Sequence, residues 1–217
     1  MTQKRTLHLL NGQSMYNYFK MTQFLEEELM IPFNEAMCYG DTCNDVFSHE
    51  FTRMRAKVHH VTPEQYTEIT LKPLKPLLYR DFTHLSLWFD LDMFCQINIL
   101  TILAWLDQTD YKGEIELYIV GDRFEVKDHF TLKAGGYYTI YKQVLIQKKF
   151  PTSIFPDFLK IGIELYLNYL NKDSDLIRYI KKYQDVSEEE LVTKLIAEFQ
   201  HYGLGDIQYL EMIKLYR

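Results

Sequence analysis

Asp90, Asp92 and Gln96 lie within the most apolar stretch of the chain, residues 84–106 (HLSLWFDLDMFCQINILTILAWL). Asp90 and Asp92 stand between an alternating, strand-like run and a helical pattern that begins near residue 91. Paired carboxylates at such a joint can hold a divalent metal ion or transfer protons, but one acid can equally cap the helix while the other faces water. Gln96 follows Asp92 by four residues, so both lie on one helix face. Buried there, they need a partner, either a ligand or a neighbouring loop.

Other polar residues follow the other predicted strands. A buried run at residues 5–10 stops at the turn signal Asn11-Gly12, after which Ser14 can cap a helix. A second predicted strand closes at Gly40. Parallel strands bring their carboxyl ends to one edge of a sheet, where α/β proteins bind ligands. These residues therefore join Asp90, Asp92 and Gln96 as candidates for one ligand site.

Several common site types are absent from the sequence. It holds no G-x-S-x-G, no P-loop and no G-x-G-x-x-G. The run HEFTR at residues 49–53 has arginine where the second histidine of H-E-x-x-H must stand. Three cysteines without a C-x-x-C pair argue against a disulfide framework or a zinc site. The sequence therefore lacks the readily recognised motifs of hydrolases, NTPases, dinucleotide-binding proteins and zinc proteases.

Charge and hydropathy limit the partners. The net charge of −6 argues against an electrostatic grip on nucleic acid, which depends on clustered Lys and Arg. No apolar run reaches the roughly 18–20 residues of a membrane span. The first residues, MTQKRTLHLLNG, contain too short an apolar stretch for a signal peptide. A cytoplasmic location without membrane contact is expected.

Hydrophobic periodicity predicts the fold class. Strands at residues 5–10, 31–39, 84–89 and 114–120 alternate with helical patterns through about residue 125. Alternation of this kind predicts an α/β fold with a mostly parallel, Rossmann-like sheet and flanking helices. The helix after Asp92 is too evenly apolar for one narrow stripe, so it is expected to be buried on most sides.

The end of the chain reads differently. After a predicted linker at residues 151–156, helices are expected at residues 157–169, 175–183, 187–202 and 206–216. We therefore predict an α/β domain at residues 1–150 and a C-terminal helical subdomain at residues 151–217.

Four segments carry a family resemblance. They are residues 7–14 (LHLLNGQS), 35–40 (EAMCYG), 55–56 (RA) and 87–100 (LWFDLDMFCQINIL), of which the last is the most specific. In this order they resemble the bacterial domain of unknown function family 1835. That family has no established activity, and its relatives are sometimes labelled transcriptional regulators.

The resemblance implies which residues to test. It adds Glu35 and Arg55 to Asn11, Gly12, Gly40, Asp90, Asp92 and Gln96. The chain departs from the family pattern in three places, because Gln13 replaces an acid, Asp41 replaces a proline and Asp90 stands where glutamate is commoner. The loss of the acid at position 13 argues against a family-wide metal chemistry through that position.

Two functions remain open. The first is a cytoplasmic protein that binds a small anionic or nucleotide-like ligand at the strand ends. There Glu35, Asp90 and Asp92 would supply negative charge or contacts to a divalent metal ion, Arg55 would contact phosphate or carboxylate, and Asn11, Ser14 and Gln96 would donate or accept hydrogen bonds. Whether this site is catalytic is left open by the sequence.

The alternative is a regulatory or interaction protein, including a DNA-binding transcriptional regulator that acts through the C-terminal helices. Residues 151–217 carry 8 Lys and Arg against 11 Asp and Glu, a net charge of −3, which disfavours DNA. Their amphipathic, tyrosine-rich helices suit packing or self-association better, so a homo-oligomer is also open.

Overall fold

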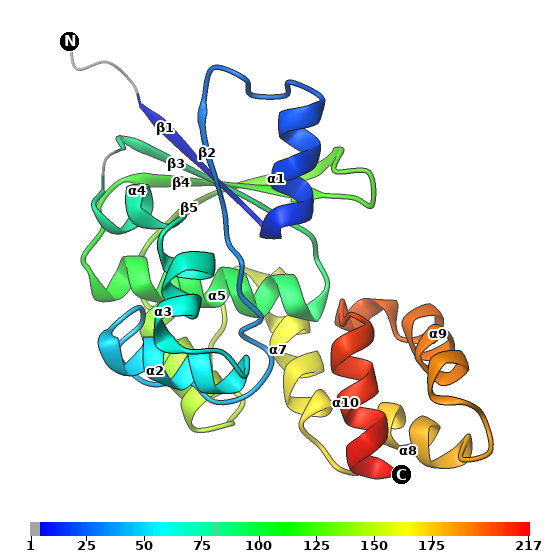
Figure 1. The fold of residues 1–217 in the computed structure, drawn as a ribbon. Coiled ribbons are helices and arrows are strands. Elements are labelled where there is room, and N and C mark those ends of the chain that lie inside the picture. Colours follow the sequence, from blue (N-terminus) through cyan, green and yellow to red (C-terminus); the bar gives the residue numbers. More distant parts are fainter. Residues whose placement is uncertain (1–4, 81) are drawn as a thin grey trace.

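The computed structural model describes residues 5–80 and 82–217, and it confirms the α/β fold. Five strands of the described residues form one sheet (Figure 1), in the order β2 (Leu29–Pro32), β1 (Thr6–Leu10), β3 (His84–Phe89), β4 (Glu114–Val120) and β5 (Val126–Lys133). The first four strands are parallel, and β5 runs antiparallel to β4. The Rossmann fold has a different strand order, so the predicted term Rossmann-like applies only loosely.

The order in which strands are added to the sheet changes direction between β1 and β3. The chain leaves β1 toward the β2 edge and then crosses back to place β3 on the other side of β1. In open α/β sheets such a reversal opens a crevice beyond the carboxyl ends of the two strands. Here those ends are Leu10, followed by Asn11, and Phe89, followed by Asp90.

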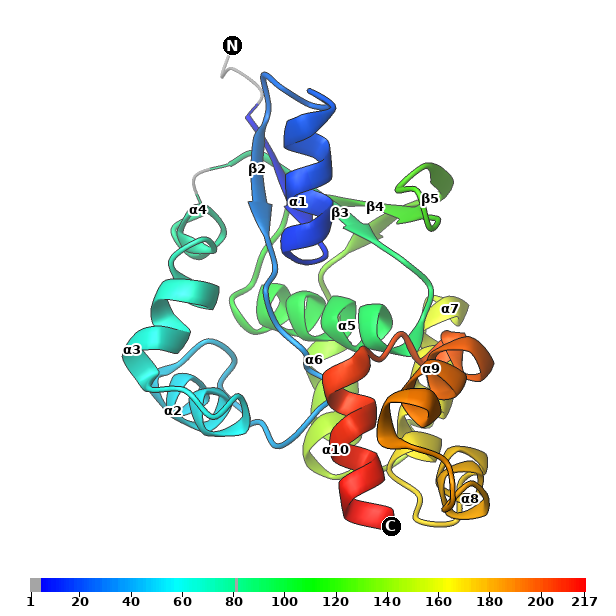
Figure 2. The same ribbon diagram turned by 45° about the vertical axis from the view of Figure 1, so that its right-hand side comes forward.

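The two faces of the sheet are covered unequally (Figure 2). Helix α1 (Gly12–Met21) places Met15 and Phe19 against Leu10 and Trp88 on one face. Helix α5 (Met93–Gln108) packs against the other face and buries nearly its whole length. This confirms the prediction of a helix buried on most sides.

The crossing from β2 to β3 is helical. It contains α2 (His49–Val58), α3 (Pro63–Tyr66) with a π-helical turn at Thr67–Leu71, and α4 (Lys75–Leu78). Thr62 and Gln65 form a capping box at the start of α3, and the π-turn ends at Leu71, directly before Lys72-Pro73. Both features agree with the sequence, in which Thr62-Pro63 starts a helix and the Lys-Pro repeat stops it.

The rest of the chain is largely helical. Helix α6 (Tyr137–Tyr141) continues into a π-helical turn at Lys142–Ile146, and is followed by α7 (Asp157–Tyr169), α8 (Asp175–Lys182), α9 (Glu188–Glu198), a 3-10 turn at Gln200–Tyr202 and α10 (Asp206–Tyr216). Helix α7 packs along α5. The predicted division at residue 150 stays a prediction. Among the described helices, none has the length and hydropathy required to span a membrane.

One strand prediction was wrong, and one strand was missed. The second strand ends at Pro32 rather than Tyr39, because buried side chains described below hold residues 35–41 away from the sheet. Strand β5 was missed, because it lies at the sheet edge with most side chains exposed and so lacks an apolar alternation.

One predicted helix cap was also wrong. Helix α1 begins after Asn11 rather than Ser14, because Gly12 adopts a left-handed φ of +83° that turns the chain directly into the helix. Helix α5 is capped by Asp92, which accepts the Cys95 N–H, so one acid of the Asp90 and Asp92 pair does cap the helix, as the sequence allowed.

Gly162 sets the distance between α7 and α5. Its N–H donates to Gln96 Oε1 over 3.1 Å, and a Cβ added at Gly162 would lie 2.5 Å from Gln96 Cβ. Alanine favours a helix over glycine by about 1 kcal/mol. Gly162→Ala should nevertheless lower the free energy of unfolding by about 1–3 kcal/mol, because the new methyl group forces the helices apart.

Chemical denaturation measures this change. The neighbouring Ile161 is 58% exposed, so Ile161→Ala serves as the control and should stay within about 0.5 kcal/mol of wild type. A Gly162→Ala protein as stable as the control would contradict the close approach.

Candidate functional site

A fully buried asparagine on α5 joins the ends of β1 and β2. Asn98 Nδ2 donates to the Glu35 carbonyl over 2.9 Å and to Asn11 Oδ1 over 3.3 Å. Its Oδ1 accepts the Met37 N–H over 3.0 Å. These bonds occupy the side-chain amide on both sides, and they tether residues 35–37 to the middle of the helix.

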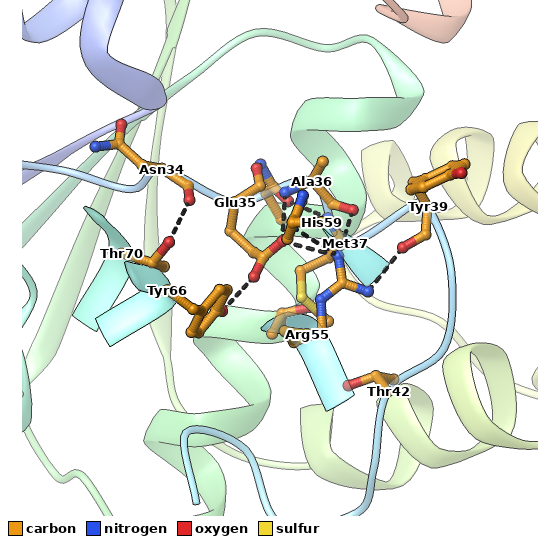
Figure 3. A network of polar contacts seen from close by, with 12 residues as sticks. Asn34, Glu35, Ala36, Met37, Tyr39, Thr42, Arg55, His59, Tyr66 and Thr70 are labelled. Carbon is orange, nitrogen blue, oxygen red and sulfur yellow. Dashed lines mark hydrogen bonds and ion pairs between the residues drawn. The ribbon is translucent and has the colours of Figure 1, made fainter. Parts of the chain in front are cut away.

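Beyond Asn98 lies a buried ion pair (Figure 3). Arg55 Nη2 on α2 contacts Glu35 Oε1 at 2.8 Å, and neither side chain is exposed. Arg55 Nη1 also donates to the carbonyls of Tyr39 (2.7 Å) and Asp41 (3.0 Å). The guanidinium therefore fixes the loop after β2 as well as neutralising Glu35.

Two further side chains reach the same carboxylate. The Tyr66 hydroxyl donates to Glu35 Oε2, and His59 Nε2 lies 2.6 Å from Oε1. Burial by itself would raise the pKa of Glu35, but the positive charge of Arg55 and the hydrogen bonds from His59 and Arg55 lower it to about 2. Glu35 is thus a stable anion, and His59, whose side chain is 31% exposed, connects it to the surface.

On its other side Asn11 extends the network to the sheet edge. Asn11 Nδ2 donates to Cys95 Sγ over 2.9 Å, and the Cys95 N–H donates to Asp92 Oδ1 over 2.7 Å. Burial raises the pKa of Asp92 to about 6, and the negative charge of Asp90 adds to this effect. Burial also raises the pKa of the Cys95 thiol well above its usual value, so Cys95 is not a nucleophile here.

Asp92 lies in a cavity of about 710 Å³ at the carboxyl ends of β3 and β4. The α/β part supplies Asp90, Asp92 and Asp122. The C-terminal helices supply the opposite wall, which includes His201, Gly203 and Tyr209. The volume falls within the range of small-molecule sites, and such sites commonly lie at the boundary between two parts of a chain.

The structure divides the nine candidate residues. Asn11, Glu35, Arg55 and Asp92 belong to one connected network, and Asp90 lies beside Asp92 in the cavity. Gly12 opens α1 at the same edge. Ser14 is exposed on α1, and Gly40 lies apart, against Val58 of α2.

Gln96 is bound within the protein. Its Nε2 donates to the Leu91 carbonyl and its Oε1 accepts the Gly162 N–H. The partners expected from the sequence were a ligand or the loop after the second strand, and the structure gives neither. Gln96 therefore joins α5 to its own preceding turn and to α7.

Sequence reasoning missed several members of the network, namely Asn98, His59, Tyr66 and Cys95. Asn98 carried a signal, because it is a second amide in an otherwise apolar helix, two residues after Gln96. The others carried none. The roles of His59 and Tyr66 depend on how α2 and α3 fold over residues 35–41, and that of Cys95 depends on the end of β1 lying beside α5.

A metal site finds no support in the described side chains, where no three His, Cys, Asp or Glu residues are grouped to hold an ion. Comparison of the chain with protein families, curated proteins and solved structures finds no match. The resemblance drawn from residues 7–100 stays a prediction.

Removing one partner of the Glu35–Arg55 pair should be severe. Glu35→Gln leaves a buried guanidinium without its counter-charge, and we expect a loss of about 3–5 kcal/mol in the free energy of unfolding. Arg55→Met should cost at least as much, because the carbonyls of residues 36, 39 and 41 lose their donor as well.

A double-mutant cycle by urea denaturation checks the pairing. The double variant Glu35→Gln/Arg55→Met should lose less stability than the two single losses added together, by more than about 1 kcal/mol. Simple additivity would mean that the two side chains act independently.

The Glu35–Arg55 pair should account for part of the loss of stability in acid. The pKa of Glu35 is lowered from 4.5 to about 2 by folding. Its stabilisation is therefore complete above pH 4.5 and is lost as the pH falls toward 2. The free energy of unfolding of wild type minus that of Glu35→Gln, measured between pH 6 and 3, should shrink with acid. A constant difference would contradict the ionised state of Glu35.

Proposed function

We propose that the protein binds a small nucleotide-like ligand at the carboxyl ends of β1, β3 and β4. The observation that carries this proposal is the cavity of about 710 Å³ beside the point where the strand order reverses. Open α/β sheets bind ligands at this position, because diverging loops leave a crevice there. A cytoplasmic location, expected from the sequence, forms part of the proposal.

The acidic lining indicates which part of the ligand enters the cavity. Asp90, Asp92 and Asp122 are acceptors, and no Lys or Arg is among the described residues that line the cavity. They suit hydrogen-bond donors such as sugar hydroxyls and the amino groups of a base, and they would repel phosphate. We therefore narrow the predicted anionic ligand to one that places an uncharged part beside these three aspartates.

The start of α1 suits the anionic part. In the described structure no side chain caps this helix, and a Cβ added at Gly12 would meet no atom within 4 Å. Unpaired N–H groups at a helix start favour phosphate. Asn11, the residue before α1, is linked to Asp92 through Cys95, so the start of α1 and the cavity lie at the same edge of the sheet.

The DNA-binding alternative gains no such support. Tyr209, Met212 and Ile213 of α10 are buried in the protein core rather than presented on a surface. The acidic balance of residues 151–217 also remains unfavourable. We therefore propose ligand binding alone.

A thermal-shift series tests the proposal with nucleosides, nucleotides and inorganic phosphate as probes. A nucleotide at about 100 times its Kd should stabilise the protein by about 2.7 kcal/mol. Asp90→Asn should reduce the shift given by nucleosides and nucleotides, because it turns one of the two carboxylate acceptors into an amide donor and removes the negative charge.

The matched control is Asp185→Asn, an exposed aspartate outside the cavity, which should keep the full shift. The proposal is wrong if no nucleoside or nucleotide raises the melting temperature of wild type. It is also wrong if Asp90→Asn responds as the control does.

A further inference from the structure

The strand-end cavity lies between two bodies of the protein. One wall consists of Asp90, Leu91, Asp92 and Asp122 at the ends of β3 and β4, and the other of residues 196–209. Helices α8, α9 and α10 hold one another, since α10 contacts both α8 and α9, and Arg217 donates to the Val186 carbonyl over 2.7 Å. We call residues 175–217 the C-terminal lid. Figure 2 shows α9 and α10 beside the start of α5.

Gly203 is the point at which the lid touches the cavity floor. It adopts a left-handed φ of +64° in the turn before α10, and a Cβ at this position would overlap the Asp92 carboxyl group. The lid backbone therefore lies directly on that carboxyl group. The lid also meets α7, where Asn168 Nδ2 donates to the Tyr202 hydroxyl over 2.8 Å. It meets the loop after β2 where the Glu211 carboxylate bonds to Tyr39, which raises the pKa of Tyr39 to about 12.

Among the described residues around it, Asp92 has no Lys or Arg to offset its burial. The titratable groups around it are Asp90 on its own loop, Asp122 at the end of β4, Cys95 on α5, Cys38 in the loop after β2, His201 in the lid and Tyr209 on α10. Asp90 carries the same sign of charge. Asp92 Oδ1 accepts a hydrogen bond from the Cys95 N–H.

We propose that the C-terminal lid opens and closes over the cavity, and that a proton on Asp92 holds it closed. A neutral carboxyl group can lie against Gly203 without water, whereas a charged carboxylate loses hydration when the lid covers it. A ligand hydroxyl or amino group that reaches Asp92 would replace the proton and close the lid. This last step rests on the proposed function, but the pH response of the empty protein does not.

The direction and size of the pH effect on lid closure follow from the raised pKa of Asp92. Its pKa is raised from 3.8 to about 6 in the closed structure. Closure is therefore favoured below pH 3.8 and weakens as the pH rises through 6. If opening restores the ordinary pKa, the ratio of closed to open protein falls by up to about a hundredfold, because each pKa unit is a factor of ten.

Distances between two spin labels measure the opening. Ala197→Cys on α9 and Arg123→Cys after β4 provide exposed label sites on the two sides of the cavity, while the three native cysteines are buried. In wild type the long-distance population should be small at pH 5 and should rise at pH 7.5. In Asp92→Asn, which still caps α5 but cannot ionise, the short distance should persist at both pH values.

Two further variants complete the test. Asp122→Asn lines the same cavity away from Gly203 and should respond to pH as wild type does. Gly203→Ala should hold the lid open at both pH values. The proposal is overturned by a wild-type distance that does not change with pH, by an equal change in Asp92→Asn, or by a closed lid in Gly203→Ala.

These measurements use no ligand. A failure to bind nucleotides, with the lid still responding to pH, would remove the proposed function and leave the lid. Nucleotide binding without a pH response would do the reverse.

Discussion

The buried pair between Glu35 and Arg55 is the constraint on which the rest of the polar interior depends. Two charges are removed from water completely, and this is tolerable only because the carboxylate and the guanidinium find further partners on three segments. Those partners hold the loop after β2 off the sheet and against α2. The course of residues 35–41, and with it the early end of β2, follows from satisfying these charges.

The strand-end edge concentrates two kinds of polar group for different reasons. Asn11 and Asn98 are paired with other protein groups, so they stabilise the join between β1 and α5. Asp90 and Asp92 have no Lys or Arg beside them in the described part of the chain, and burial raises the pKa of both. The hydrogen-bonded network and the pair of acids therefore meet at Cys95. Only the two acids have groups free to bind a ligand.

The sequence was most informative where pattern is local. The strand at residues 84–89, the helix after it, the Thr62 cap and the helix at residues 157–169 depend on spacing along a single segment, and the structure has them at those positions. The candidate acids and Asn11 were visible because they interrupt apolar runs. Strand β5 and the ends of β2 and α1 were not predictable in the same way, since an edge strand, a tethered loop and a glycine turn are fixed by tertiary contacts. The membership of His59, Tyr66 and Asn98 in one network likewise depends on residues far apart along the chain.

The network through Asn98 also constrains how the sequence can change over evolutionary time. Its members come from the end of β1, the loop after β2, α2, α3 and α5, and each bond has one donor and one acceptor. A substitution at one member strands the group opposite, so the tolerable changes are those made together. Positions 11, 35, 55 and 98 should consequently be inherited as a block in descendants of this chain, while the exposed strand β5 drifts freely.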